Sequence, residues 1–342
     1  MLSLLSFMHA FVDGICASVM LGQITPAFTA EAAVLVLFYN LLAFSTQGLT
    51  GLLTDRIGHH RELTLISAAL LIAGLLFPCP PLASAVFKTC LVGLGNSLFH
   101  VAGGAKVITR SAKKALPLGI FVAPGAMGLT LGTLFPSLGG IFAVLLAACC
   151  VGLCFIKDEL PSATSNKNSA DMPLTPMVLF AAAALLFCIF SRAFGGSIVA
   201  FPWKSTALLS IITTAAVVAG KMLGGLLCDR FGAVKTTAIS IPLAAVLVIF
   251  CSQWMLPSLA GQLLLNLSMP ISLWLLCLLL PQNPGFAFGL AASFLYPGTL
   301  FAMFLPDAPL LRTSVSAAVF VINTVLMIFA AVYISKRSKT AV

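Results

Sequence analysis

The sequence predicts an all-α membrane protein with twelve transmembrane helices in two related six-helix bundles. The prediction comes from the composition, from apolar runs of membrane-spanning length, and from a charged motif that occurs once in each half. Hydrophobic residues make up 60% of the 342 residues and charged residues 8%, and the mean hydropathy is +1.12. This composition excludes a soluble domain. A span needs about 20 apolar residues, so the chain has room for twelve spans with short loops.

The apolar runs are separated by turns rich in proline, glycine or charged residues. In the first half we expect spans at about 3–25, 32–53, 63–77, 84–107, 116–135 and 138–156. In the second half we expect them at about 176–200, 205–227, 236–255, 258–280, 285–305 and 310–334. The extended polar stretch at 157–175 is predicted to be a cytoplasmic linker between an N-terminal bundle at 1–156 and a C-terminal bundle at 176–342.

The net charge of +9 is concentrated in a few loops and at the C-terminus. By the positive-inside rule this places both termini in the cytoplasm. The basic excess therefore indicates topology in a lipid bilayer, and no nucleic-acid partner is expected. The chain opens directly into an apolar run without a basic leader, so no removable signal peptide is expected. The ten cysteines show no CxxC or metal-ligand spacing, and no cofactor is predicted.

The charged motif is GLLTDRIGHHR at 51–61, with a near-copy, GLLCDRFGAVK, at 225–235. Each copy closes an apolar run, and ordinary cytoplasmic turns are the alternative interpretation. The shared positions are Gly51, Asp55, Arg56, Gly58 and Arg61 in the first copy, and Gly225, Asp229, Arg230, Gly232 and Lys235 in the second.

This pattern resembles the loop between helices 2 and 3 of the major facilitator superfamily and its weaker echo between helices 8 and 9. His60 stands where that family usually has a second basic residue. The resemblance implies a secondary transporter with two halves around a central cavity, working by alternating access. It also implies that the motif pairs with helix ends in one conformation, without specifying a substrate.

Asp13 is the acidic residue placed deepest in a predicted span, and His9 lies one helical turn before it. A carboxylate at that depth costs about 2.5–3.5 kcal/mol on insertion scales and usually faces the bundle interior. We predict that Asp13 couples protons or contacts substrate; the alternative is a structural carboxylate paired with a buried Lys or His.

The predicted fourth span is the most polar and contains Lys88, Asn96, His100 and Lys106. His9 and His100 are candidates for a proton relay, because imidazole titrates near neutral pH, or for helix-packing hydrogen bonds. With Asp13 they can also be interpreted as a metal site, but nothing in the spacing requires one and no metal is predicted.

Arg192 and Lys88 lie toward the outer half of their spans, where the positive-inside rule does not account for them. Lys106 and Lys221 lie near inner ends, where they either snorkel to the headgroups or face the cavity. Several cations facing one cavity with a single carboxylate would make it net positive. We therefore expect an anionic or zwitterionic substrate.

Three segments together resemble the fosmidomycin-resistance branch of the superfamily: His9-x-x-x-Asp13, GLGNSLFHVAGG at 93–104 and APGAMGLTLGTLFP at 123–136. Val101 departs from that pattern by replacing a proline, as does Thr133, while a proline occurs earlier at Pro124. The fifth-span glycines are also similar to the proton-antiporter signature of drug exporters, where close packing of helix 5 limits leak. The residues that fit are Gly95, Phe99 and His100 in the fourth span and Gly125, Gly128 and Gly132 in the fifth.

The resemblance implies a proton-coupled exporter of a small organic molecule, monomeric, in a bacterial inner membrane. An importer or uniporter of a sugar, amino acid or organic acid is the alternative within transport. A membrane sensor or enzyme on a transporter fold is the alternative from another class. The sequence contains no HExxH, no GxSxG, no clustered carboxylates and no output domain, so we predict that the protein is not an enzyme.

Overall fold

The computed structural model describes residues 1–111, 114–156, 173, 175–306 and 308–340. The linker predicted at 157–175 lies outside the described residues except for Pro173 and Thr175. All regular secondary structure in the described chain is helical, which confirms the predicted all-α class. Eleven helical segments among these residues are long and apolar enough to cross a membrane. A further helix, His60–Leu76, has 17 residues and occupies the position of the predicted third span.

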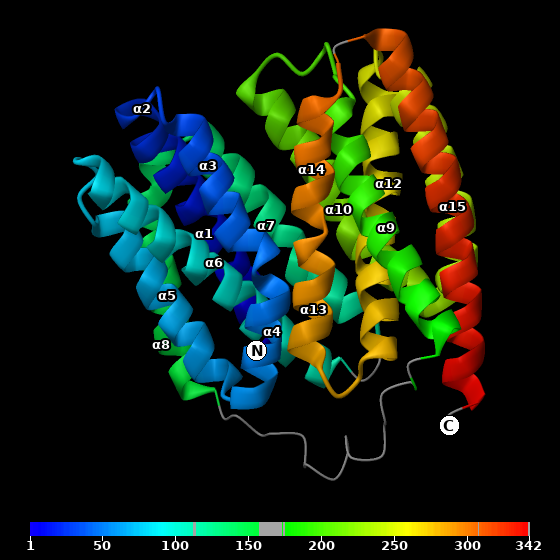
Figure 1. The fold of residues 1–342 in the computed structure, drawn as a ribbon, viewed down its shortest axis with the longest axis horizontal. Helices are drawn as coiled ribbons and strands as arrows, with labels where there is room; N and C mark the ends of the chain where they lie inside the picture. The colour runs from blue at the N-terminus through cyan, green and yellow to red at the C-terminus, as the bar shows by residue number, and fades with distance from the viewer. Residues whose placement is uncertain (112–113, 157–172, 174, 307, 341–342) are drawn as a thin grey trace. The chain divides into compact units, whose positions relative to one another are not determined.

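Each predicted span coincides with one helix or with consecutive helices (Figure 1). The first half contains α1 (Leu2–Val19), η1 (Met20–Ile24), α2 (Thr25–Ala27), α3 (Ala32–Asn40), η2 (Leu41–Ser45), α4 (Gln47–Ile57), α5 (His60–Leu76), α6 (Leu82–Arg110), α7 (Leu116–Leu134), η3 (Pro136–Leu138) and α8 (Gly139–Phe155). The second half contains α9 (Pro176–Ile198), α10 (Ala207–Phe231), α11 (Ala233–Phe250), α12 (Met255–Leu279), α13 (Pro284–Ser293), α14 (Leu295–Phe304) and α15 (Pro309–Thr340).

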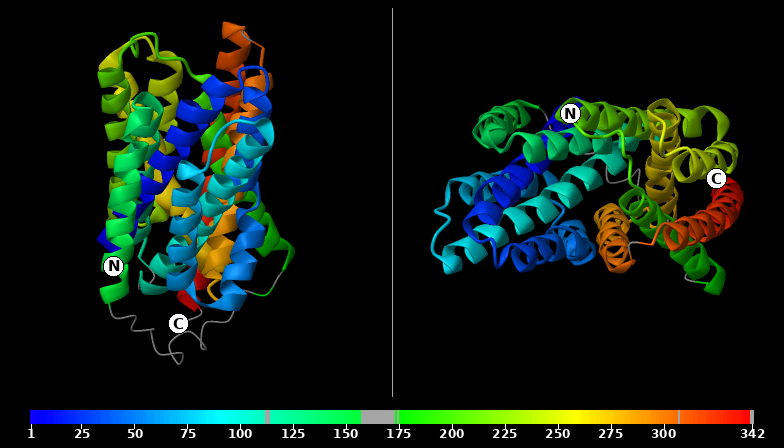
Figure 2. Two further views of the ribbon diagram at one scale, coloured as in Figure 1. Left: turned by 90° about the vertical axis from the view of Figure 1, so that its left-hand side faces the viewer. Right: turned by 90° about the horizontal axis from the view of Figure 1, so that it is seen from above.

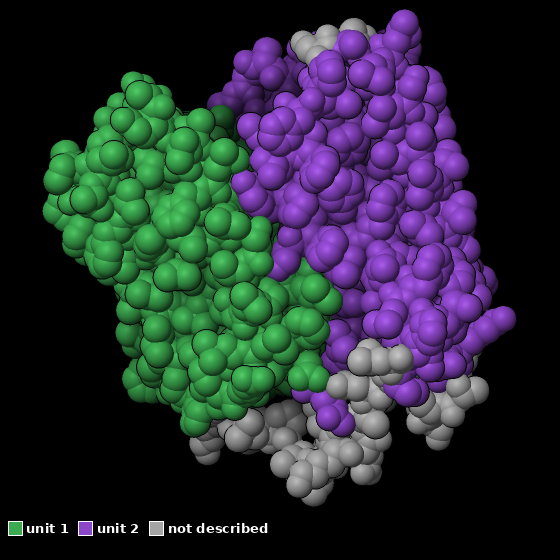
Figure 3. Space-filling model, viewed as in Figure 1, with its two compact units in different colours: residues 1–110, 120–165, 283–292 green, residues 111–119, 166–282, 293–342 purple. Residues whose placement is uncertain are grey.

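The chain forms two compact units, shown in green and purple in Figure 3. Unit 1 comprises the described residues of 1–110, 120–165 and 283–292, and unit 2 those of 111–119, 166–282 and 293–342. Most of α13 therefore packs with unit 1, although it lies late in the sequence. Likewise, the first turn of α7 belongs to unit 2 and the rest of that helix to unit 1. The domain boundaries predicted at 156 and 176 stay a prediction.

In unit 1, α1 is the most enclosed helix and contacts α5, α6 and α8 (Figure 2). It also approaches α7 closely, because two glycines of α7 face its backbone. A Cβ built on Gly128 would overlap the carbonyl oxygen of Ala10, and one on Gly132 would overlap the carbonyl oxygen of Gly14. Small residues are what allow membrane helices to approach this closely. The fifth-span glycines thus place α7 against α1.

In unit 2, α12 is the central helix and contacts α9, α10, α11 and α15. The same small-residue packing recurs here, since Gly220 and Gly224 of α10 face the carbonyl oxygens of Leu263 and Leu267 of α12. Two apolar clusters complete the unit. One is centred on Phe194, Ile198 and Ala302, and the other on Ala244, Leu265 and Phe320.

Substitution of Gly128 by alanine should lower the free energy of unfolding by about 1–3 kcal/mol, the usual cost of overpacking, because the new methyl group meets a rigid backbone carbonyl. The matched control is Gly140→Ala in α8, where nothing lies within 4 Å of the new Cβ. That change should be neutral or slightly stabilising, since alanine is the better helix former. Thermal unfolding in detergent checks both, and equal stabilities of the two variants would contradict the packing argument.

Candidate functional site

Three predicted residues converge on the carboxylate of a fourth, Asp13, inside unit 1. His9 and Asp13 lie one turn apart on α1, with His9 Nε2 3.4 Å from Asp13 Oδ2. His100 on α6 places its Nε2 3.5 Å from Asp13 Oδ1, and Asn96 Nδ2 donates a hydrogen bond to the same oxygen at 3.2 Å. The two imidazole rings meet edge to face, with their centroids 4.4 Å apart. The side chains are largely buried, with Asp13 the most exposed at 18%.

The other ring nitrogen of each histidine is held by a backbone carbonyl. His9 Nδ1 lies 2.9 Å from the carbonyl oxygen of Phe121, and His100 Nδ1 lies 2.9 Å from that of Asn96. A carbonyl only accepts hydrogen bonds, so each Nδ1 carries the proton. In a neutral imidazole the Nε2 lone pair then faces the carboxylate. Two electron-rich atoms then lie close together, and protonation of Nε2 or binding of a cation between them would relieve their repulsion.

The surroundings of the cluster are apolar and tightly packed. The rings of Phe99 and Phe121 lie 5.9 and 4.9 Å from that of His9. Gly125 of α7 faces the cluster, because a Cβ there would overlap His9 Nε2 and lie 2.5 Å from Asp13 Oδ2. Because Gly125 has no side chain, the His9 imidazole and the Asp13 carboxylate have the space to lie next to each other.

Two participants are not among the residues predicted from the sequence. The Phe121 carbonyl orients His9, but any residue type supplies a carbonyl, so no sequence signal exists. The Cys16 thiol accepts a hydrogen bond from Asn96 Nδ2 at 3.4 Å. Cys16 lies on α1 one turn after Asp13 and two turns after His9, on the same helix face, and this spacing is the signal that could have identified it. The amide oxygen of Asn96 is buried with no partner among the described residues.

His9, Asp13 and His100 are also the described residues that could hold a metal ion. Their ligand atoms all lie within 4.8 Å of one another. His100 is far from the other two along the chain and is brought to them only by the packing of α6 on α1.

The repeated motif caps a helix in each unit. In unit 1, the Asp55 carboxylate accepts hydrogen bonds from the backbone N–H groups of Gly285 and Phe286 at the start of α13, both at 2.8 Å. In unit 2, Asp229 accepts them from Ala115 and Leu116 at the start of α7, at 2.8 and 3.0 Å. A carboxylate is favourable at a helix N-terminus, where N–H groups lack partners and the helix dipole is positive.

The motif glycines make these caps possible. Gly51 and Gly225 lie one turn before the aspartates and face the backbone of Gly285 and of Leu116, respectively, with no room for a Cβ. Gly58 and Gly232 end α4 and α10 with φ of 71° and 86°, which favours glycine.

The basic motif residues lie at the surface or toward it. Arg61 donates to the carbonyl oxygen of Cys154 near the end of α8, a favourable place for a cation. Arg230 lies over the ring of Phe231, at 5.3 Å from its centroid. Arg56 and Lys235 are exposed.

The predicted basic residues occupy different environments. Lys88 Nζ donates hydrogen bonds to the carbonyl oxygens of Leu75 and Phe77 at 3.2 and 2.6 Å, so it caps the C-terminal end of α5. Arg192 on α9 is 9% exposed, and no hydrogen bond or ion pair to its guanidinium is found within the described residues. Lys106 and Lys221 are both buried.

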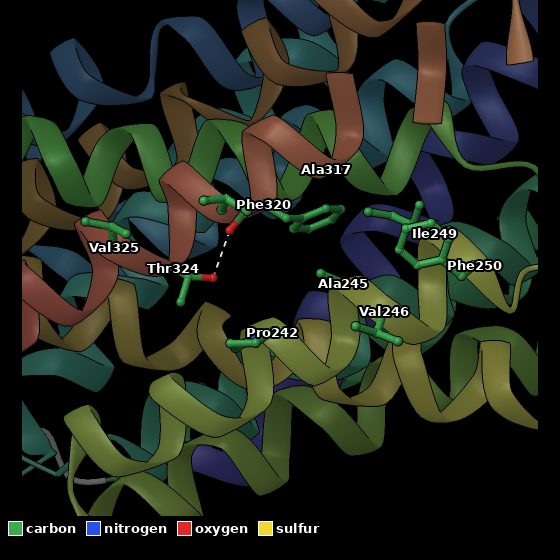
Figure 4. A pocket seen from close by; sticks show the side chains of 10 residues that line it. Pro242, Ala245, Val246, Ile249, Phe250, Ala317, Phe320, Thr324 and Val325 are labelled. Carbon is green, nitrogen blue, oxygen red and sulfur yellow. Dashed lines mark hydrogen bonds between the residues drawn. The ribbon is translucent and has the colours of Figure 1, made fainter. Parts of the chain in front are cut away.

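Unit 2 also contains an apolar cavity of about 330 Å³ between α11 and α15 (Figure 4). Its lining includes Pro242, Val246, Phe320 and Val325, and the Thr324 hydroxyl is bonded to the Phe320 carbonyl oxygen at 2.8 Å. Without charged groups it offers no specific contact to a polar solute, so it is not the candidate site.

Comparison of the sequence with known protein families and with curated proteins gives no match. Solved structures do match. One is a variant of the Escherichia coli fucose:proton symporter FucP, with a TM-score of 0.69 and 13% identity over 96% of this chain and 97% of that one. Another is the major facilitator superfamily transporter FucP in the outward conformation, with a TM-score of 0.66 and 13% identity over the same shares. The chain therefore has the major facilitator fold, as predicted.

Replacement of Lys88 by methionine should destabilise the protein by about 1–3 kcal/mol, because the change leaves buried carbonyl groups of α5 without a donor. Methionine keeps the apolar stem and removes only the ammonium group. Lys204→Met, in an exposed loop, is the control and should have little effect. Thermal unfolding of the purified variants measures the difference, and unchanged stability of Lys88→Met would rule out the capping role.

Proposed function

We propose that this protein is a proton-coupled secondary transporter that exports a small anionic or zwitterionic organic molecule by alternating access. The observation that carries the proposal is the convergence of His9, Asn96 and His100 on the Asp13 carboxylate within a transporter fold. Asp13 exchanges the proton, and the two histidines relay it or contact the substrate.

The substrate class follows from Arg192. A guanidinium that is nine-tenths buried inside a membrane-spanning helix is costly unless an anion neutralises it. Arginine also presents parallel N–H donors that match phosphonate, phosphate and carboxylate groups. Asn323 on α15 packs against the same part of α9. Its amide is buried with no partner among the described residues, and its backbone oxygen accepts the Cys188 thiol, one turn before Arg192, at 3.6 Å.

The two aspartate caps support a conformational role for the repeated motif. Asp55 and Asp229 each hold the start of one helix in the described conformation. We propose that these bonds break and re-form during the transport cycle, so that the caps stabilise one state without contacting substrate. Membership of the fosmidomycin-resistance branch, a bacterial inner membrane, cytoplasmic termini and a monomeric state belong to the same proposal and rest on the sequence patterns.

Uptake by symport is the second candidate, because the solved structures with the same fold include a fucose:proton symporter. In that case the same carboxylate would release its proton together with the substrate. The direction of the proton movement that a substrate elicits separates the two candidates.

Substitution of Asp13 by asparagine should abolish substrate-dependent proton movement, because the amide cannot exchange a proton, while its similar size and the Asn96 contact preserve folding. The assay uses liposomes that hold a pH-sensitive dye inside and carry an imposed proton gradient. The panel is a phosphonate, an organic acid, a neutral sugar and a lipophilic cation. Glu62→Gln, an exposed carboxylate paired with His59, is the matched control.

Proton movement elicited by the phosphonate or the acid in the wild type, and lost only in Asp13→Asn, would support the proposal. Unchanged coupled flux in Asp13→Asn would remove this residue from the mechanism. A response to the lipophilic cation alone would contradict the anionic substrate. Proton movement in the same direction as the substrate would favour the second candidate.

Replacement of Arg192 by glutamine should raise the substrate concentration for half-maximal flux by about 10–100-fold, since a charge-assisted hydrogen bond contributes about 1.5–3 kcal/mol. The maximal flux should fall less than the affinity. The phosphonate or acid that responds in the panel is titrated against both proteins in the same liposomes. An unchanged half-saturation concentration would exclude Arg192 from substrate binding.

A further inference from the structure

The cluster in unit 1 has the donor set of a transition-metal site as well as that of a proton site. His9 Nε2, His100 Nε2 and an Asp13 oxygen all lie within 4.8 Å of one another. Two imidazole nitrogens and one carboxylate favour Zn²⁺, Co²⁺, Ni²⁺ or Fe²⁺. Mg²⁺ and Ca²⁺ prefer six or more oxygen ligands, which this cluster does not provide.

Two of the distances are close to those of a tetrahedral ion. Ligands at about 2.0–2.1 Å from zinc at tetrahedral angles lie about 3.3 Å from one another. The separations from the Asp13 oxygens to His9 Nε2 and to His100 Nε2 are 3.4 and 3.5 Å. These two distances end on different oxygens of the carboxylate, and the three ligand atoms lie within 4.8 Å of one another, so the side chains would draw closer together for both imidazoles and one oxygen to bind the same ion. The fourth position would remain open to water or to a substrate group.

The groups behind the ligands are also those of metal sites. A histidine that binds a metal through one nitrogen almost always donates the other N–H to a carbonyl or carboxylate. His9 Nδ1 does this to the Phe121 carbonyl and His100 Nδ1 to the Asn96 carbonyl. Asn96 Nδ2 in turn donates to the Asp13 carboxylate. Each ligand is therefore oriented with its lone pair toward the common centre before any ion binds.

We propose that His9, Asp13 and His100 bind one divalent transition-metal ion, with Asn96 orienting the carboxylate. The binding stands on this geometry alone. Its consequence for transport rests on the proposed function, because an ion on Asp13 excludes the coupling proton and should block proton-driven flux.

The test titrates Co²⁺ into the purified chain, freed of any histidine tag, in detergent and without a gradient. We expect one Co²⁺ per chain with the strong visible absorption of a four-coordinate ion, displaced by Zn²⁺ and not by Mg²⁺. His9→Gln and His100→Gln, on two different helices, should each weaken binding by at least about 100-fold. Asn96→Ala should weaken it by about 10–100-fold, as loss of an outer-shell partner does.

His59→Gln is the matched control, because the side chain of His59 is 72% exposed and lies on α5's N-terminal side. Its affinity for Co²⁺ should equal that of the wild type. The proposal would be overturned if folded wild-type protein bound no Co²⁺. It would also be overturned if His9→Gln and His100→Gln both bound Co²⁺ with the affinity of the wild type. Since this titration needs no transport, metal binding and the proposed function can fail separately. Wild-type liposomes that lose proton-driven flux on addition of Zn²⁺ would link the two.

Discussion

The Asp13 carboxylate is the group on which the organisation of unit 1 depends. A carboxylate deep in a bilayer costs about 2.5–3.5 kcal/mol on insertion scales, and here the hydrogen bond that Asn96 of α6 donates offsets part of that cost. Asn96 and His100 bring α6 to it, and His9 lies beside it on α1. His9 in turn binds the Phe121 carbonyl of α7. The contacts around the carboxylate therefore also link three helices and bring His9, Asp13 and His100 together.

The repeated motif makes the same kind of helix cap in both units. The first glycine lets the start of another helix approach, the aspartate one turn later caps that start, and the last glycine ends the motif's own helix. In each unit the capped helix is distant in the sequence, α13 for Asp55 and α7 for Asp229. The motif thus joins helices that lie far apart in the sequence. Because its aspartates bind backbone N–H groups of this chain, the pattern carries no information about a substrate.

Helical spacing predicts which residues of the candidate site share a helix face. His9 and Asp13 share one face of α1, and Asn96 and His100 share one face of α6, because each pair is one turn apart. That these two faces meet is a property of the packed unit. Lys88 and Arg192 illustrate the same distinction. Both are basic residues within predicted spans, yet Lys88 caps α5, whereas no hydrogen bond or ion pair to the Arg192 guanidinium is found within the described residues. The sequence alone does not distinguish these two environments.

The sequence by itself determined the helical membrane class, the positions of the spans and the duplication, because apolar run length and motif spacing are local and depend on no contact. Only the tertiary structure decided which helix each aspartate caps, which carbonyl orients each histidine and which side chains share the Asp13 carboxylate. The physical reason is that these partners are mostly backbone groups. Every residue has a carbonyl and nearly every residue an N–H, so their identity is set by helix packing and not by residue type.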